Sequence, residues 1–311
     1  MMSQKAVGLV EQLAAEGVQS WLAVEGAPPV AAPGRLARTG RAPAGVLLPA
    51  HVPPDPREVR RLCERAREAS MSPGGGSGLV SAPVDPAFAD DAPSLVRASW
   101  SLWVNVDRPN LLVQIPATEA GLEAMSECLA LGMSVNATLV CTVEQADRVF
   151  DALLGGLERA LAAGSASSGI RVFLTCPVGL LDSVGVPTAG VPTSGVATAR
   201  LLYALRERRL RNTWWRVLRA GNATPPTLLW ASLRPHHLAR LIGWNTGVAF
   251  TAPDLEAAAT EAELAGDVMP GLREGAESLR FDAGRAAPGA ASYLLTSELT
   301  RCRNAWHSAA H

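Results

Sequence analysis

The feature that most constrains the fold of this chain is a repeated alternation between short apolar runs and longer helical patterns. A short run of β-branched and apolar residues is typical of a buried strand, and strands that alternate with helices are typical of parallel sheets. Eight such runs can close a (β/α)8 barrel, in which each strand is followed by a helix. The runs span Ser20 to Val24, Ala44 to Leu48, Gly78 to Val84, Asn110 to Ile115, Ser134 to Cys141, Arg171 to Pro177, Thr227 to Leu233 and Gly247 to Thr251.

Helical patterns fill most of the intervals between these runs. Thr118 followed by Glu119 is typical of a helix start, and Gly132 of a helix end. The helical patterns span Pro56 to Ala69, Ala89 to Asn105, Thr118 to Gly132, Val143 to Ala163, Thr198 to Leu218 and Leu255 to Glu263. Barrels of this length form one domain. We therefore predict an α/β fold, a single (β/α)8 TIM barrel over residues 1–311, with 264–311 as a C-terminal helical extension that includes a helix at Ser292 to Ser308.

Composition limits the partners of this chain. The 28 basic and 29 acidic residues give a net charge of −1, which does not favour nucleic acid or an anionic membrane as a partner. No apolar stretch approaches the roughly twenty residues of a membrane span, and no signal peptide pattern is visible. Five scattered cysteines without a Cys-x-x-Cys pair favour reduced thiols. We therefore expect a cytoplasmic protein that binds a small molecule and needs no cofactor.

The densest basic stretch runs from Arg206 to Arg219 and contains six arginines. The favoured interpretation is a solvated helix face, because arginine stems cover apolar surface while the guanidinium groups remain in water. The alternative is an anion site.

Two neighbouring motifs, Asp107 to Thr118 and Gly132 to Val140, carry the most specific signal. They resemble the transaldolase family, in which a lysine before Ile-Pro-Ala-Thr forms a Schiff base with the sugar carbonyl and the next strand carries Asn-x-Thr. In this sequence Gln114 stands at the lysine position, and the only lysine, Lys5, is expected in a frayed N-terminus. A carboxamide nitrogen is not a nucleophile, so the resemblance implies the family's barrel without its covalent chemistry.

The resemblance extends from about Gly8 to Thr260, and other catalytic positions have also changed. Ala23 stands where the family's first strand ends in an acid/base Asp. Pro83 stands where a Glu works with the catalytic water. Leu47 and Leu48 replace polar residues that reach the substrate.

The position of the family's phosphate-binding arginine is different too. Thr175 and Cys176 fall where the family strand ends in Ser-Arg. A sugar phosphate carries a charge of about −2 and needs cationic or helix-terminus donors. The resemblance therefore implies a pocket that suits a neutral, largely apolar ligand instead.

Some polar positions of the family survive, namely Asn136, Thr138 and Ser232. We predict that Gln114, Asn136 and Thr138 are the catalytic hydrogen-bonding groups. The predicted substrate-binding residues are Ala23, Leu47, Leu48, Ser81, Pro83, Thr175, Cys176, Trp230, Ser232, Arg234, His236 and Phe250.

Two further features allow more than one interpretation. We interpret His236 and His237 as a solvated helix start. The alternative is that one of them acts as a general acid or base. Metal binding is disfavoured, because no cluster of Asp, Glu or Cys accompanies them. We therefore predict no metal site.

The segment Val184 to Gly195, rich in Gly, Pro and Thr, follows the sixth strand and suits either a mobile lid or a surface loop.

Two classes of function follow. In the first, the barrel is a repurposed enzyme of specialised metabolism that performs a cyclisation, an isomerisation or a lyase-type step by orienting its substrate, without a Schiff base. In the second, it is a catalytically inactive pseudoenzyme that binds a ligand or a protein. The sequence favours the first, because Asn-x-Thr and Trp-Ala-Ser strand ends are kept, and leaves the second as the alternative. It does not decide whether the chain forms a homo-oligomer.

Overall fold

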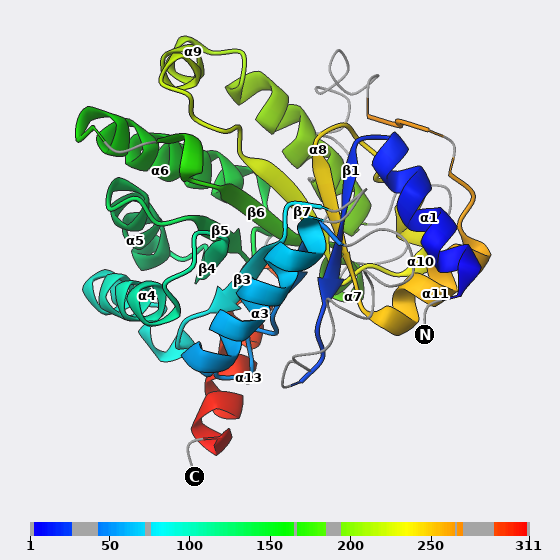
Figure 1. Ribbon diagram of the computed structural model, residues 1–311, viewed down its shortest axis with the longest axis horizontal. Coiled ribbons are helices and arrows are strands. Elements are labelled where there is room, and N and C mark those ends of the chain that lie inside the picture. Colours follow the sequence, from blue (N-terminus) through cyan, green and yellow to red (C-terminus); the bar gives the residue numbers. More distant parts are fainter. Residues whose placement is uncertain are drawn as a thin grey trace.

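The eight strands of the protein form a closed parallel barrel in the order β1 to β8. The computed structural model, shown in Figure 1, describes residues 3–26, 43–71, 76–164, 167–184, 194–264, 266–269 and 289–309. The eight apolar runs of the sequence are therefore confirmed as strands. Their bounds are β1 (Val18–Ala23), β2 (Gly45–Leu47), β3 (Leu79–Pro83), β4 (Leu111–Pro116), β5 (Val135–Thr138), β6 (Val172–Pro177), β7 (Thr227–Ala231) and β8 (Thr246–Phe250).

Most helices surround this barrel on its outer side (Figure 1), and the last one in the chain crosses one end of it. They are α1 (Gln4–Ala15), α3 (Pro56–Ser70), α4 (Ala92–Val106), α5 (Glu119–Ala130), α6 (Val143–Ala162), α7 (Val178–Val184), α8 (Ser194–Arg209), α9 (Thr213–Ala220), α10 (Pro235–Leu238), α11 (Ala252–Glu261) and α13 (Ala290–Ala309), with short 3-10 turns η1 (Pro86–Phe88) and η2 (Ser167–Gly169). Threonine, asparagine and aspartate caps begin several of them, as Thr118 does for α5 and Thr142 for α6. The predicted (β/α)8 TIM barrel is confirmed.

Side chains of each strand alternate between two separate apolar clusters, because successive residues of a strand point to opposite faces. One cluster lies inside the barrel and includes Trp21, Leu112, Phe173 and Leu229. The other lies between strands and helices and includes residues next to these in sequence, such as Val113. Trp21 and Phe173 meet edge to face, with ring centroids 5.0 Å apart. The interior is therefore apolar over this part, and the polar groups described below sit further along the strands.

Two predictions about helices are corrected. Lys5 does not lie in a frayed terminus: it is exposed on α1, which Ser3 caps and which buries Leu9 and Leu13. The single helix expected from Thr198 to Leu218 is two helices, α8 and α9. The chain breaks between them because the Asn212 side chain accepts a hydrogen bond from the backbone N–H of Trp215 and so begins a new helix.

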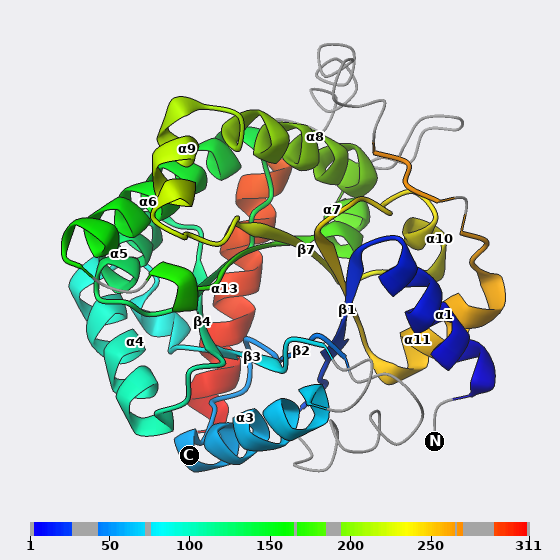
Figure 2. The same ribbon diagram turned by 45° about the horizontal axis from the view of Figure 1, so that its top comes forward.

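The last helix, α13, lies across the C-terminal ends of the strands (Figure 2). Arg303 donates from Nε to the Pro86 carbonyl oxygen at 2.9 Å, just beyond β3. Trp306 donates from Nε1 to the Ala50 carbonyl oxygen, also at 2.9 Å, just beyond β2. The predicted C-terminal helix thus packs on its own barrel, at the end where TIM barrels build their sites. Residues 185–193 of the predicted lid or loop lie outside the described residues, as do 270–288 of the extension.

Removing the Trp306 hydrogen bond should weaken this packing measurably. Trp306→Phe keeps a ring but loses the N–H that reaches Ala50, so the free energy of unfolding should fall by about 1 kcal/mol. Trp100→Phe, at a position 46% exposed, is the matched control and should change it by less than about 0.5 kcal/mol. Urea denaturation followed by circular dichroism measures both. Equal losses in the two variants would contradict the assigned role of Trp306.

Among the segments that the structure describes, none of the helices is long and apolar enough to cross a membrane.

Candidate functional site

Gln114 lies near the C-terminal end of β4 and is fixed by two hydrogen bonds. Its Nε2 donates to the carbonyl oxygens of Leu48 and Ser81, each at 2.9 Å, and the residue is 4% exposed. Both partners can only accept, which fixes the orientation of the amide, with nitrogen toward β2 and β3. Because both N–H groups are committed to backbone carbonyls, Gln114 links the ends of three neighbouring strands.

Asn136 of β5 extends this arrangement across the barrel. Its Nδ2 donates to Ser81 Oγ at 3.0 Å, and its Oδ1 accepts from Thr175 Oγ1 at 2.7 Å. Asn136 and Ser81 are fully buried and Thr175 is 5% exposed. The strand register places Asn136 directly beside Gln114 and beside Phe173. The structure therefore brings four predicted site residues from β3 to β6 into one hydrogen-bonded group, which we call the polar floor: Ser81, Gln114, Asn136 and Thr175.

The polar floor contains no charge and no amine. Amide and hydroxyl groups of Gln, Asn, Ser and Thr neither titrate near neutral pH nor form imines. Most of its hydrogen-bonding atoms are already paired within the floor. Gln114 Oε1 accepts no hydrogen bond from the described residues. It is not among their buried polar atoms that lack a hydrogen-bond partner, so it is accessible and can accept a hydrogen bond from a ligand. The floor is thus able to orient a ligand through hydrogen bonds and offers that ligand no amine with which to form an imine.

Other predicted residues surround the floor. Ala23 and Leu47, half-buried at the ends of β1 and β2, pack against the interior cluster. Pro83 is buried and pairs in register with Gln114. Thr138 is half-buried at the end of β5, in register with Pro116. These four positions bring apolar surface and one hydroxyl group to the same end of the barrel.

Four residues predicted to bind substrate face the other way. The side chains of Leu48, Cys176, Trp230 and Phe250 belong to the cluster between strands and helices, because each follows or precedes an inward-facing residue by one position. Leu48 reaches the floor only through its carbonyl oxygen. Burial raises the pKa of the Cys176 thiol well above its usual value, which also removes it as a nucleophile. Assigning these side chains to the pocket was therefore wrong.

The predicted residues after β7 are exposed. Ser232, Arg234 and His236 all lie on the surface, and Ser232 adopts a left-handed backbone with φ of 56°. Partial desolvation and the neighbouring His237 lower the pKa of the exposed His236 imidazole. The expected solvated helix start holds for His236 but not for His237, which is fully buried.

His237 forms a buried pair with Asp182, a residue of α7 that sequence reasoning did not single out. His237 Nε2 lies 2.7 Å from Asp182 Oδ2, and His237 Nδ1 accepts from the Arg234 backbone N–H at 3.0 Å. Because the Nδ1 lone pair is occupied, the ring proton is on Nε2. The Nε2–H group donates a hydrogen bond to the Asp182 carboxylate. Asp182 Oδ1 also accepts from the Gly195 N–H at 2.6 Å. The pair thus fastens α7, α8 and α10 to one another.

Asp182, His236 and His237 are also the one group of potential metal ligands found among the described residues, with ligand atoms within 4.8 Å of one another. The hydrogen bonds argue against a metal there. His237 could coordinate through Nε2 only by losing that proton while Nδ1 still accepts from Arg234, which would require an imidazolate. These residues do not fit a resident cation.

Substituting Asp182 should loosen this junction. Asp182→Asn can present its single oxygen to only one of the two donors, so the free energy of unfolding should fall by about 1 to 2 kcal/mol. Ser183→Ala, which removes an exposed hydroxyl that donates to the Leu180 carbonyl oxygen, is the control and should have a smaller effect. Thermal unfolding compares the two. If the Asp182→Asn protein is as stable as the wild type, the Asp182–His237 pair does not stabilise the packing of these helices.

The C-terminal helix adds charged groups that sequence reasoning also missed. Glu298 and Arg301 of α13 form an ion pair at 2.8 Å, and the Glu298 side chain is 16% exposed. Glu298 lies close enough to Cys141, beyond β5, to add to the rise in the pKa of that thiol to about 12, which burial mainly causes. The same pair affects the pKa of His51, beyond β2, which burial mainly lowers. The helical pattern was visible in the sequence, but the surface on which it packs was not.

Comparisons with known proteins agree on one family. The profile described as Transaldolase/Fructose-6-phosphate aldolase matches residues 57–234. A transaldolase of Frankia alni is 38% identical over 185 residues, covering 56% of this chain and 50% of the relative. A transaldolase of Saccharopolyspora erythraea is 34% identical over 248 residues, covering 74% and 67%. The chain spans about half the length of the first curated relatives that it matches.

One solved structure, described as a fructose-1,6-biphosphate aldolase of Coccidioides immitis, was also compared with this chain. The alignment covers 97% of this chain and 93% of the aldolase chain, with a TM-score of 0.36 and a sequence identity of 13%. That similarity is too low to support a conclusion. The family profile covers more than half of the chain, and its match includes the strands that build the polar floor. This chain belongs to the transaldolase/fructose-6-phosphate aldolase family.

Proposed function

We propose that this chain is a family member that forms no Schiff base and acts non-covalently on a neutral, largely apolar small molecule at the strand ends. The observation that carries the proposal is the fixation of Gln114, whose two N–H groups are both held by backbone carbonyls. Its relatives are named transaldolases. The sequence motif around Gln114, which resembles that family's Schiff-base motif, supports the proposal that Gln114 stands at the imine-forming position. Lys5, the only lysine, lies on α1 and does not replace it.

The class of ligand follows from the groups around the floor. Ala23, Leu47 and Pro83 offer apolar surface, while Gln114 Oε1 and the Thr138 hydroxyl supply polar contacts. Thr175 contributes a hydroxyl group to the floor, and we take this position to correspond to the phosphate-binding Ser-Arg of the family. A dianionic phosphate gains little in such a site, because it would lose its hydration without a cationic partner.

Turnover needs a group that transfers a proton, and α13 supplies a candidate. Glu298 is largely buried, lies near Cys141 and His51 at the strand ends, and is paired with Arg301. A carboxylate on the helix that lies across the strand ends suits a cyclisation, an isomerisation or a lyase-type step, in which a bound molecule is oriented and a proton is moved. We therefore place catalysis ahead of binding alone.

The second candidate is a binding module without catalysis. It is favoured by the pairing within the floor, where Asn136, Ser81 and Thr175 already satisfy one another. A floor of this kind can hold a ligand rigidly without any role in bond making.

Proton exchange distinguishes the two candidates. Cyclohexanone, a small neutral ketone, is incubated with the protein in D2O, and deuterium at its α-carbons is followed by NMR. Catalysis predicts exchange above the rate without protein, lost in Glu298→Gln and kept in Glu261→Gln, an exposed acidic control on α11. Exchange at the protein-free rate, together with saturable binding of the ketone, would support the binding module instead.

The proposed ligand class makes a separate prediction. Isothermal titration with fructose and fructose 6-phosphate should give affinities within about threefold of each other, because the described floor offers no cation to the phosphate. A fructose 6-phosphate affinity at least about tenfold higher, and suppressed by inorganic phosphate, would contradict the proposal.

A further inference from the structure

A cleft opens at the opposite end of the barrel from the polar floor. It has a volume of about 460 Å³ and lies beside the starts of β7 and β8, where Pro225 and Asn245 precede these strands. Helices α8 and α9 contribute its other walls. The strands are parallel, so this cleft is separate from the proposed ligand site, and nothing in the proposed function uses it.

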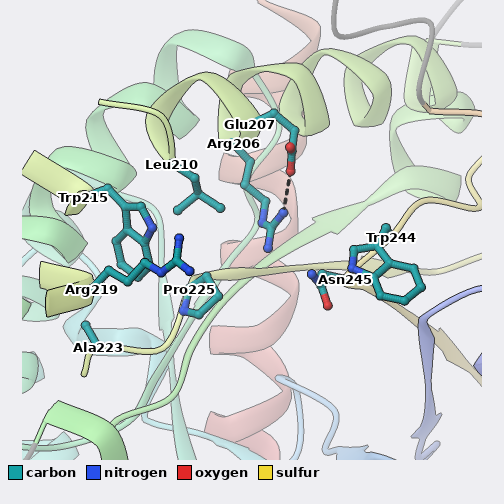
Figure 3. Close-up of a pocket in the computed structure, with 9 residues that line it drawn as sticks. All are labelled: Arg206, Glu207, Leu210, Trp215, Arg219, Ala223, Pro225, Trp244 and Asn245. Carbon is teal, nitrogen blue, oxygen red and sulfur yellow. Dashed lines mark hydrogen bonds and ion pairs between the residues drawn. The ribbon is translucent and has the colours of Figure 1, made fainter. Parts of the chain in front are cut away.

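Several hydrogen-bond donors that line this cleft have no partner in the part of the chain that the structure describes. Trp215 is 4% exposed, and its indole Nε1 has no partner among the described residues. The Arg219 guanidinium also lacks one among them, as does the Asn245 side chain. Figure 3 shows Trp215, Arg219 and Arg206 converging on one space, with Asn245 and Trp244 on its other side. Trp215 Nε1 is not one of the buried unpaired atoms of the described residues, and Arg219 and Asn245 are exposed, so all three donors are accessible to a ligand in the cleft.

Arg206 gives the cleft a fixed charge. It is 2% exposed, donates from Nε to the Pro226 carbonyl oxygen at 2.7 Å, and pairs through Nη1 with Glu207 Oε1 at 2.8 Å. Burial lowers its pKa, but a guanidinium remains protonated throughout the physiological range. The expectation that the whole arginine stretch is a solvated face is therefore wrong for Arg206.

The charges of the cleft indicate the charge of its ligand. Arg206 and Arg219 together with Glu207 leave a net charge of +1. That balance matches a monoanion better than a dianionic phosphate. A guanidinium with no competing partner, such as that of Arg219, can hold both oxygens of a carboxylate.

The remaining walls indicate the body of the ligand. Leu210, Ala223 and Pro225 are apolar, and Trp215 and Trp244 supply ring surface, with Trp244 55% exposed. Flat apolar groups pack well on indole rings. We propose that this cleft binds a small aromatic or otherwise planar monocarboxylate, with its carboxylate on Arg219 and Trp215 Nε1 and its body against the tryptophan rings.

Titration with benzoate tests the proposal. The full chain should bind benzoate with a Kd on the order of 1 mM, as expected for a ligand of this size. Arg219→Gln should weaken binding by about tenfold or more, and Trp215→Phe, which keeps a ring but loses the N–H, by about fivefold. Arg216→Gln, on the same helix but outside the cleft, should leave the Kd unchanged. Circular dichroism verifies that each variant is folded.

Other ligands test whether the cleft selects a carboxylate. Benzamide, which has the shape of benzoate without its charge, should bind at least about tenfold more weakly. Equal binding of benzamide and benzoate, tighter binding of inorganic phosphate, or equal losses in Arg216→Gln and Arg219→Gln would overturn the proposal. So would benzoate binding that Arg219→Gln leaves intact, because the carboxylate would then sit elsewhere. No saturation by benzoate would overturn it as well. Each outcome is independent of the imine test on the polar floor.

Discussion

Gln114→Lys should give the protein the ability to form an imine with a ketone. Borohydride should reduce that imine to a stable adduct on the variant, whereas the unmodified chain should give no adduct. Dihydroxyacetone and sodium borohydride should leave about one reduced adduct per chain on the variant, because a lysine at this position restores a nucleophilic amine at the strand ends. Burial at a site 4% exposed favours the neutral form of that amine, which is the form that attacks a carbonyl. Intact-protein mass spectrometry and peptide mapping measure the yield and the position of the adduct.

A matched control separates position from lysine content. Gln4→Lys adds an amine on the exposed start of α1, where it stays protonated and hydrated, so it should give far less adduct under the same conditions. Equal yields from Gln4→Lys and Gln114→Lys would contradict the assignment of position 114 to the strand-end site. A Gln114→Lys protein that is folded by circular dichroism but gives no adduct would contradict it too.

Asn136→Ala should lower the free energy of unfolding by about 2 to 4 kcal/mol. Asn136 is the centre of the polar floor, and its loss leaves Ser81 Oγ and the Thr175 hydroxyl buried with one partner fewer each. The variant also leaves an internal cavity. Chemical denaturation of the wild type and the variant measures the difference.

A second substitution shows whether hydrogen bonding causes that loss. In the background of Asn136→Ala, Thr175→Val removes the hydroxyl that has lost its partner, so it should cost less than it does in wild type, by about 1 kcal/mol. Purely additive losses would show that Asn136 acts by filling space. The Asn136–Thr175 bond would then contribute little to stability.

The strands were readable from the sequence because their information is local. Runs such as the one ending at Ile115 are short, apolar and bounded by helix starts, and each is a strand of the barrel. The break between α8 and α9 depended on one local contact, the Asn212 cap, which competed with a continuous helical pattern. The prediction of Gln114 and Asn136 as site residues followed from family resemblance, and the structure brings both into the floor.

What the sequence could not supply are facts of three-dimensional contact. Cys176 and Thr175 are neighbours in one strand, and only the register decides that Thr175 joins the floor while Cys176 faces the helices. The Asp182–His237 pair joins residues 55 positions apart. Burial of Arg206 within a basic stretch depends on the Pro226 carbonyl oxygen of a later segment. No periodicity within one segment reports such contacts.

The most direct test of the absence of imine chemistry is borohydride trapping on the unmodified protein. The chain is incubated with fructose 6-phosphate, reduced with borohydride and weighed as an intact protein, with a protein-only reduction beside it. Because Gln114 holds both its N–H groups on backbone carbonyls and Lys5 is exposed on α1, the mass should not change. A reduced sugar adduct that maps to any residue at the strand ends would contradict the account.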